Sequence, residues 1–320
     1  MKRLTIGLLV ALLLAAALSV AAGKVWVPFD AWTADDPRSI IIVELRLPRT
    51  VLALLVGAAL GLSGAVMQGY LRNPLADPGL FGVSSGAAFG AVVALYCGYA
   101  AQMWLLPGFA LVGAGVTMAL LALIAGRSGS LILFTLGGMI LTSITGSLTA
   151  LAISLAPTPF VSSSIVTWLM GALTDRSWDD VKVAAPLIAA GMGVLAMTAR
   201  ALDALTLGEA AARSMGVDPA RLQRLVIVGV ALTVGASVAS AGIIGFVGLI
   251  VPHLVRPLAG NRPSAILLPS ALAGAVLLTF ADSLVRLAPT VSELRLGIAM
   301  SMLGGPFFLY LLIAMRRRLA

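Results

Sequence analysis

Long apolar runs alternate with short polar connections along the whole chain. Runs of roughly 20 predominantly apolar residues can cross a bilayer as helices. A shorter apolar stretch, Ser162–Asp175, predicts a half-helix or re-entrant element after the fifth run. An even number of spans would place both termini on the same side. The sequence predicts ten spans, near residues 3–22, 50–69, 82–99, 104–125, 131–155, 182–199, 225–240, 242–258, 265–285 and 297–315.

The first run follows the basic start Lys2-Arg3. A signal peptide with a small-residue cleavage site near Ala22 has the same pattern. Because the run is long enough to cross a bilayer, the sequence favours an uncleaved first span.

Composition supports a single transmembrane domain over residues 1–320. The chain is 60% hydrophobic and only 11% charged, whereas a soluble core of this size needs more polar surface. The 34 glycines lie largely inside apolar runs and predict close helix packing. One cysteine, Cys97, leaves no disulfide framework or thiolate cluster within one chain.

The net charge of +8 could indicate a nucleic-acid partner, but its distribution indicates orientation. With the N-terminus inside, thirteen basic residues lie on the inner side and eight on the outer side. This is the asymmetry of a membrane protein with both termini in the cytoplasm, so nucleic acid is not needed to explain the charge. The inner basic residues are Lys2, Arg3, Arg72, Arg127, Arg200, Arg213, Arg221, Arg224, Arg256, Arg262 and Arg316 to Arg318.

The longest polar segment on the inner side is residues 201–224, between the sixth and seventh spans. Thr206 and Glu209 have the T-x-x-E spacing of a helix capping box, and Glu209 and Arg213 have the spacing of an ion pair. Gly216 is expected to end this helix, and Asp218-Pro219 to start the next. A solvated connector is the simpler alternative.

No energy source is visible in the chain. The sequence contains no G-x-x-x-x-G-K-[ST] phosphate loop. Ion-coupled carriers usually bury ionisable groups at mid-membrane depth, and here most charges fall near predicted span ends. His253, Arg256 and Asp282 come closest to exceptions, so a secondary carrier is a disfavoured alternative.

An intramembrane serine protease is a further alternative. Ser63 lies in Gly61-Leu62-Ser63-Gly64, and His253 is the only histidine. However, small residues recur every four positions around Ser63, which is typical of helix packing. These residues are Gly57, Gly61, Ala65 and Gly69.

Five stretches, in order and spacing, resemble the permease subunit of type II ATP-binding-cassette (ABC) importers for ferric siderophores, haem and cobalamin. The resemblance covers nearly the whole chain. It implies a type II importer permease fold, no catalytic residues, no cofactor or metal on this chain, and ATP and Mg on separate subunits. The stretches are RLPR from Arg46, Gly57–Ala91, LTLGEAAARSMGV from Leu205, Ser240–Arg262 and Ser292–Leu312.

The resemblance also implies partners: a second permease chain, two ATPase subunits and a periplasmic substrate-binding protein, assembled at the bacterial inner membrane. The polar segment looks like the family's coupling helix, which contacts the ATPase. Ferric siderophore is the first-choice substrate on family grounds, followed by haem and cobalamin. The coupling residues implied are Thr206, Leu207, Gly208, Glu209, Ala210, Ala211, Arg213, Ser214, Met215 and Gly216.

Four outer arginines look like docking residues for the binding protein: Arg46, Arg49, Arg286 and Arg295. Guanidinium groups suit carboxylates, although interfacial snorkelling is an alternative. Arg295 departs from the family pattern, because many relatives read E-L-P where this chain has Glu293-Leu294-Arg295.

The resemblance places the translocation pathway along the fifth span and along the half-helix region that follows it, residues 160–180. Trp168 could equally belong to an interfacial aromatic belt, and Gly171 could serve close packing. The segment Asn73–Pro78 predicts a proline-bounded inner turn with a structural role. Spans two to five and seven to ten could be inverted repeats. The implied pathway residues are Ser162, Ser163, Ser164, Trp168 and Gly171.

Overall fold

The computed structural model describes residues 2–32, 36–99, 102, 104–126, 130–289 and 292–319, with side chains to residue 314. The described part of the chain is helical and contains no strand. Arg127 and the side chains of Arg316 to Arg318 from the charge pattern lie outside the description. The helices are α1 Lys2–Ala21, α2 Leu47–Leu71, α3 Val83–Tyr96, α4 Leu105–Ala125, α5 Leu131–Ser154, α6 Pro159–Leu169, α7 Trp178–Ala196, α8 Ala199–Leu205, α9 Glu209–Ser214, α10 Pro219–Ala241, α11 Val247–Ala259, α12 Pro263–Leu287 and α13 Leu296–Leu319.

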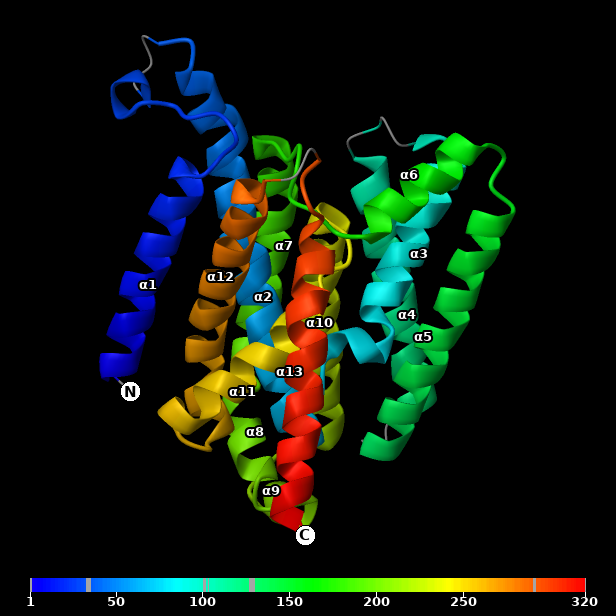
Figure 1. The fold of residues 1–320 in the computed structure, drawn as a ribbon. Coiled ribbons are helices and arrows are strands. Elements are labelled where there is room, and N and C mark those ends of the chain that lie inside the picture. Colours follow the sequence, from blue (N-terminus) through cyan, green and yellow to red (C-terminus); the bar gives the residue numbers. More distant parts are fainter. Residues whose placement is uncertain are drawn as a thin grey trace.

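The ten predicted spans correspond to ten helices or helix pairs. Seven helices are long and apolar enough to cross a membrane alone, namely α1, α2, α4, α5, α10, α12 and α13. α7 and α8, bent by 42°, form an eighth candidate. The shorter α3 and α11 occupy the other two predicted positions. Both termini lie towards one end of the molecule, which the charge pattern predicts to be the cytoplasmic end, and α6 lies at the opposite end, the predicted outer end (Figure 1).

α3 and α11 are short because irregular backbone precedes each of them. Arg72, with φ of 50°, ends α2 in the left-handed region, and the Asp77 carboxylate accepts a hydrogen bond from the Gly79 N–H at 2.8 Å. This is the predicted proline-bounded turn. Before α11, Gly242 and Phe246 both have φ of 69°, so the chain changes direction between α10 and α11.

α2 forms the centre of the bundle and is buried along most of its length. A Cβ atom on Gly57 or Gly61 would collide with a backbone carbonyl of α12, and one on Gly64 would collide with Gly248 of α11. At Gly69 a Cβ would make only ordinary contacts. The predicted small-residue stripe therefore packs α2 against α12 near Gly57 and Gly61 and ends before Gly69.

A buried amide completes the contact between α2 and α11. Pro252 has no N–H to donate to Gly248, four residues earlier in the helix. The Gln68 side-chain amide donates to the carbonyls of Gly248 and Leu249 at 3.3 Å. Its oxygen accepts from Arg256 Nη2 at 2.7 Å. Gln68 thus satisfies a backbone group that the proline leaves without its helical partner.

Candidate functional site

The predicted half-helix is α6, at the outer end. Thr158 caps it by accepting a hydrogen bond from the Val161 N–H at 3.3 Å. Beyond α6, Gly171 has φ of 68°, and a Cβ there would collide with the Ile243 carbonyl. The Gly171 carbonyl also accepts from the Gly297 N–H at 3.1 Å. Gly171 therefore packs the start of α13 against the end of α6.

A cavity of about 590 Å³ lies beside α6 at the outer end. Ser163, Ser164 and Trp168, from the predicted pathway, line it. Ser162 is not among its lining residues, and its hydroxyl donates to the Pro159 carbonyl at 2.9 Å. The further lining residues include Leu95, Gln102, Thr167, Thr174, Asp175, Arg176, Ser177, Asp180 and Arg295.

The charged side of this cavity is held by local hydrogen bonds. Ser177 and Asp180 form a capping box at the start of α7. Arg176 Nη1 lies 3.5 Å from Asp180 Oδ1, and Arg295 Nη1 donates to Thr174 Oγ1 at 3.2 Å. Asp175 has φ of 57° and is exposed. The cavity lining therefore combines two cations and two carboxylates with the hydroxyls of α6.

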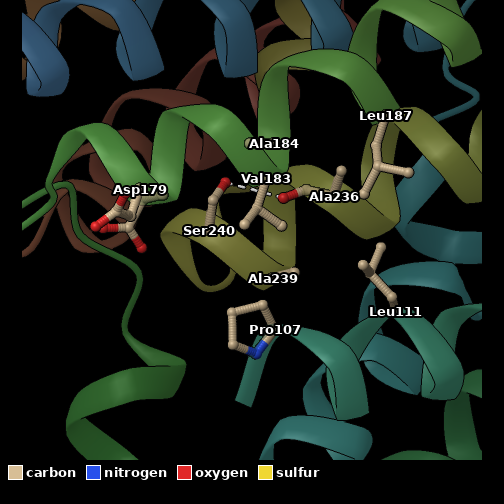
Figure 2. A pocket seen from close by; sticks show the side chains of 10 residues that line it. Pro107, Leu111, Asp179, Val183, Ala184, Leu187, Ala236, Ala239 and Ser240 are labelled. Atoms are coloured by element: carbon tan, nitrogen blue, oxygen red, sulfur yellow. Dashed lines mark hydrogen bonds between the residues drawn. The ribbon is translucent and has the colours of Figure 1, made fainter. Parts of the chain in front are cut away.

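A second hollow lies where α4, α7 and α10 meet (Figure 2). Pro107 and Leu111 come from α4, and the Ser240 hydroxyl donates to the Ala236 carbonyl at 2.9 Å within α10. Its volume of about 10 Å³ is close to the minimum for one water molecule. It is a packing gap and not a substrate site.

Arg46 does not project from the outer surface. Its side chain is buried, and its guanidinium group donates to the Val20, Ala21 and Val25 carbonyls. The first two of these belong to the last turn of α1, where carbonyls lack helical partners and the helix dipole favours a cation. Arg46 thus caps the C-terminus of α1.

Arg49 and Arg286 meet at the fully buried carboxylate of Asp282. Arg49 Nη2 lies 2.8 Å from Asp282 Oδ1, and Arg286 Nη2 lies 3.2 Å from Asp282 Oδ2. A second Arg49 nitrogen, Nη1, lies 2.9 Å from Glu293 Oε2. Arg286 also donates to the Ser19 hydroxyl in α1. These contacts join α1, α2, α12 and the segment before α13.

This geometry corrects the expected placement of the docking arginines. Arg46 and Arg286 are 6% and 3% exposed, and Arg49 is held by two carboxylates of its own chain. A partner would have to break these contacts to reach them. Of the four, Arg295 is the one whose side chain lines the open outer cavity. The spacing of Asp282 and Arg286 by four residues within an apolar helix was the available signal for an internal pair.

The polar inner segment forms the short helices α8 and α9, with a different start from the predicted one. Thr206 ends α8, and its hydroxyl donates to the Asp203 carbonyl at 2.7 Å. Gly208, with φ of 98°, precedes α9, so Glu209 is its first residue. The predicted capping box is therefore wrong, because the chain turns at Gly208 instead of capping through Thr206.

Glu209 also has a different ionic partner from the predicted one. Its carboxylate lies 3.7 Å from Arg72 at the end of α2, and no pair with Arg213 forms among the described residues. The predicted end of α9 is confirmed: Gly216 has φ of 84°, and the Val217 N–H donates to the Ala212 carbonyl at 3.0 Å. This is a Schellman ending.

α9 presents an uneven, largely exposed surface at the cytoplasmic end. Ala212 is buried against the body, whereas Leu207 and Met215 are 69% and 53% exposed. Two grooves flank this segment, with volumes of about 400 and 650 Å³. Met215 and Arg200 line both of them. Exposed apolar side chains beside grooves are typical of a protein contact surface.

Ser63 has a structural partner. Its side chain is fully buried, and its hydroxyl lies 2.7 Å from the Thr233 hydroxyl of α10. The His253 ring packs against the edge of Phe307, with ring centres 6.0 Å apart. The hydroxyl that a protease would activate is thus part of the α2–α10 contact.

Comparisons with known proteins agree with this architecture. The vitamin B12 import system permease BtuC of Citrobacter koseri is 38% identical over 96% of this chain and 93% of its own. The cobalamin import permease BtuC of Halobacterium salinarum is 39% identical over 87% of this chain and 74% of its own.

Solved structures agree as well. A metal-chelate type ABC transporter in an inward-facing conformation is 33% identical, with a TM-score of 0.90 over 98% of this chain and all of that chain. PsaBC of Streptococcus pneumoniae, 20% identical with a TM-score of 0.58 over 82% of this chain and 89% of that one, shares the fold. The FecCD transport family model matches residues 8–314. The chain therefore belongs to the FecCD transport family and is the permease subunit of an ABC importer, not an enzyme.

Proposed function

We propose that this chain moves a metal chelate from a periplasmic binding protein into the cytoplasm, powered by separate ATPase subunits. The observation that carries the proposal is α9, a short, largely exposed helix at the inner end of a bundle whose sequence has no phosphate loop. A transport subunit of this kind needs ATP hydrolysis from a partner, with ATP and Mg bound there.

α9 is the proposed contact for the ATPase. Ala212 packs against the body of the molecule, and Glu209 forms a largely exposed ion pair with Arg72, while Leu207 and Met215 remain exposed. Two glycine turns, at Gly208 and Gly216, hold its ends. A helix that packs on α8 and is joined to α10 by a tight turn can transmit a push from a partner to the spans, which a loose connector would absorb.

The outer cavity beside α6 is the proposed entry to the translocation pathway. Ser163, Ser164 and Trp168 of α6 line it, together with Arg295 from the segment before α13. Because Arg295 is accessible there, it is the outer arginine best placed to meet a carboxylate of a docking protein. A second permease chain across the pathway is part of the proposal, as the family implies.

Cobalamin becomes the first-choice cargo, because the similar permeases from Citrobacter koseri and Halobacterium salinarum carry vitamin B12 or cobalamin in their names. Ferric siderophore, favoured by the sequence interpretation, and haem are the alternatives. The bacterial inner membrane is the proposed location.

Uptake into membrane vesicles of known orientation tests the proposal. Vesicles containing the permease, its companion ATPase and its binding protein receive ATP or a non-hydrolysable analogue, with cyanocobalamin, a ferric siderophore or haem supplied on the binding-protein side. We expect accumulation of one chelate only with hydrolysable ATP. Accumulation driven by a proton or sodium gradient without ATP would contradict the proposal and indicate a secondary carrier.

A further inference from the structure

The outer cavity beside α6 has the chemistry of a binding site, as well as the position of an entry. Its volume of about 590 Å³ falls within the range of pockets that hold small molecules and cofactors. It is open to solvent, so a large chelate could place one side in it. Its lining therefore bears on which ligands the entry accepts.

One wall of the cavity offers groups that both donate and accept hydrogen bonds. Ser163, Ser164 and Thr167 lie on one side of α6, and their hydroxyls have no hydrogen-bond partner among the described residues. Serine and threonine in helices often bond back to the preceding turn, as Ser162 does here. The three hydroxyls are instead free for a ligand.

The charged part of the lining is balanced. Arg176 and Arg295 supply two cations, and Asp175 and Asp180 supply two carboxylates, so the formal charge of the lining is zero. Two of the four are in contact at 3.5 Å, namely Arg176 and Asp180. The Nε atom of Arg176 is buried with no hydrogen-bond partner among the described residues.

We propose that this cavity selects an uncharged ligand rich in amide or hydroxyl groups over a polyanionic one. An amide both donates and accepts, so it can satisfy arginines, carboxylates and hydroxyls together. A ligand with several carboxylates would gain contacts to the arginines but would also lie beside Asp175 and Asp180, and like charges held close together are costly. The proposal deepens the proposed function and rests on it, because it names the class of chelate that enters.

The test is protection of a single cysteine in the assembled transporter. Cys97→Ser removes the only native thiol, and Thr167→Cys then places one in the cavity wall, with Ser163→Cys as a second position. The rate of maleimide labelling is measured without ligand and then with one of two ligands. These are cyanocobalamin, which is uncharged and amide-rich, and haemin, which carries propionate carboxylates. We expect cyanocobalamin to slow labelling about threefold or more at concentrations above its dissociation constant, and haemin to slow it less.

A charge variant separates electrostatics from shape. Asp175→Asn makes the lining net positive, and asparagine tolerates the left-handed backbone at this position. This variant should increase protection by haemin more than protection by cyanocobalamin, because it removes a carboxylate that repels the propionates. Asp179→Asn is the matched control, because Asp179 pairs with Lys182 and does not line the cavity.

Several results would overturn the inference. They are equal protection by haemin and cyanocobalamin in the parent, the same response to both asparagine variants, no protection by either probe, or no labelling at either position. Uptake by the same complex is measured in parallel. ATP-driven uptake without protection removes this inference alone, whereas absence of ATP-driven uptake of any chelate removes the proposed function.

Discussion

Asp282 is the residue on which the stability of the outer end of the bundle depends most. It is fully buried and lies against two guanidinium groups, those of Arg49 and Arg286. A buried charge stripped of its partner is strongly destabilising, even where the complete pair adds little net stability. Because Arg286 also bonds to α1, loss of Asp282 would affect three helices.

We predict that Asp282→Asn lowers the stability of the permease by about 3–5 kcal/mol, the usual cost of breaking a buried ion pair from one side. Thermal unfolding in detergent, followed by tryptophan fluorescence, measures the change as a lower apparent Tm. Asp179→Asn makes the same chemical change in an exposed pair with Lys182 and should cost less than about 1 kcal/mol. Equal shifts in the two variants would contradict the role of Asp282.

The outer arginines mark the limit of sequence interpretation at this scale. A cation at the end of a span has the same sequence pattern whether it reaches outward to a partner or inward to a carboxylate. The partner of Arg49 lies 233 residues away in α12, so no local pattern connects them. The same holds for Glu209, whose observed partner is Arg72 and not its helical neighbour Arg213.

At the scale of elements, backbone contact determines how α2 packs. Gly57 and Gly61 lie against carbonyl oxygens of α12, where no side-chain movement could make room for a Cβ atom. The four-residue spacing of small residues was sufficient to predict this stripe. It could not show that the same stripe would end before Gly69, because that depends on where α12 begins.

We predict that Gly61→Ala destabilises the permease by about 1–3 kcal/mol, because the added methyl group overpacks the α2–α12 contact. The apparent Tm in detergent is again the measurement. Gly193→Ala, in α7, is the control, since a Cβ at that position meets nothing within 4 Å. Its Tm should stay the same or rise slightly, and a comparable loss in both variants would show that Gly61 is not a close contact.

The observed start of α9 also determines how the coupling proposal is tested. Glu209 is the first residue of the helix, a position where proline fits. Ala212 lies inside the helix, is buried, and donates its N–H to the Gly208 carbonyl at 2.9 Å. Proline at position 212 would remove that bond and distort the helix.

We predict that Ala212→Pro abolishes ATPase binding or uncouples ATP hydrolysis from transport, whereas Glu209→Pro retains most of both. Co-purification of the ATPase and chelate uptake in vesicles are the two measurements. Normal binding and normal uptake by Ala212→Pro would refute the coupling role of α9. Loss in Glu209→Pro alone would show that the Glu209 side chain, and not the helix, carries the contact.

For the whole molecule, the alternation of apolar and polar segments was enough to locate ten apolar helices or helix pairs, of which seven or eight are long enough to cross a membrane. The shortness of α3 and α11 was less evident, because apolar backbone outside a helix has the same composition as apolar backbone within one. The broken regions around Asp77 and Gly242 depend on φ values and on contacts between distant segments. The five motif stretches identified the family because their order and spacing extend over the whole chain.

The central claim is that this permease works only as part of an ATP-driven complex. Affinity purification of the chain from its native membrane in mild detergent, followed by identification of its companions, tests that claim most directly. The account predicts recovery of a P-loop ATPase in equal copy number with the permease. Repeated recovery of the chain alone under gentle conditions would contradict it, and α9 would then be a simple connector between α8 and α10.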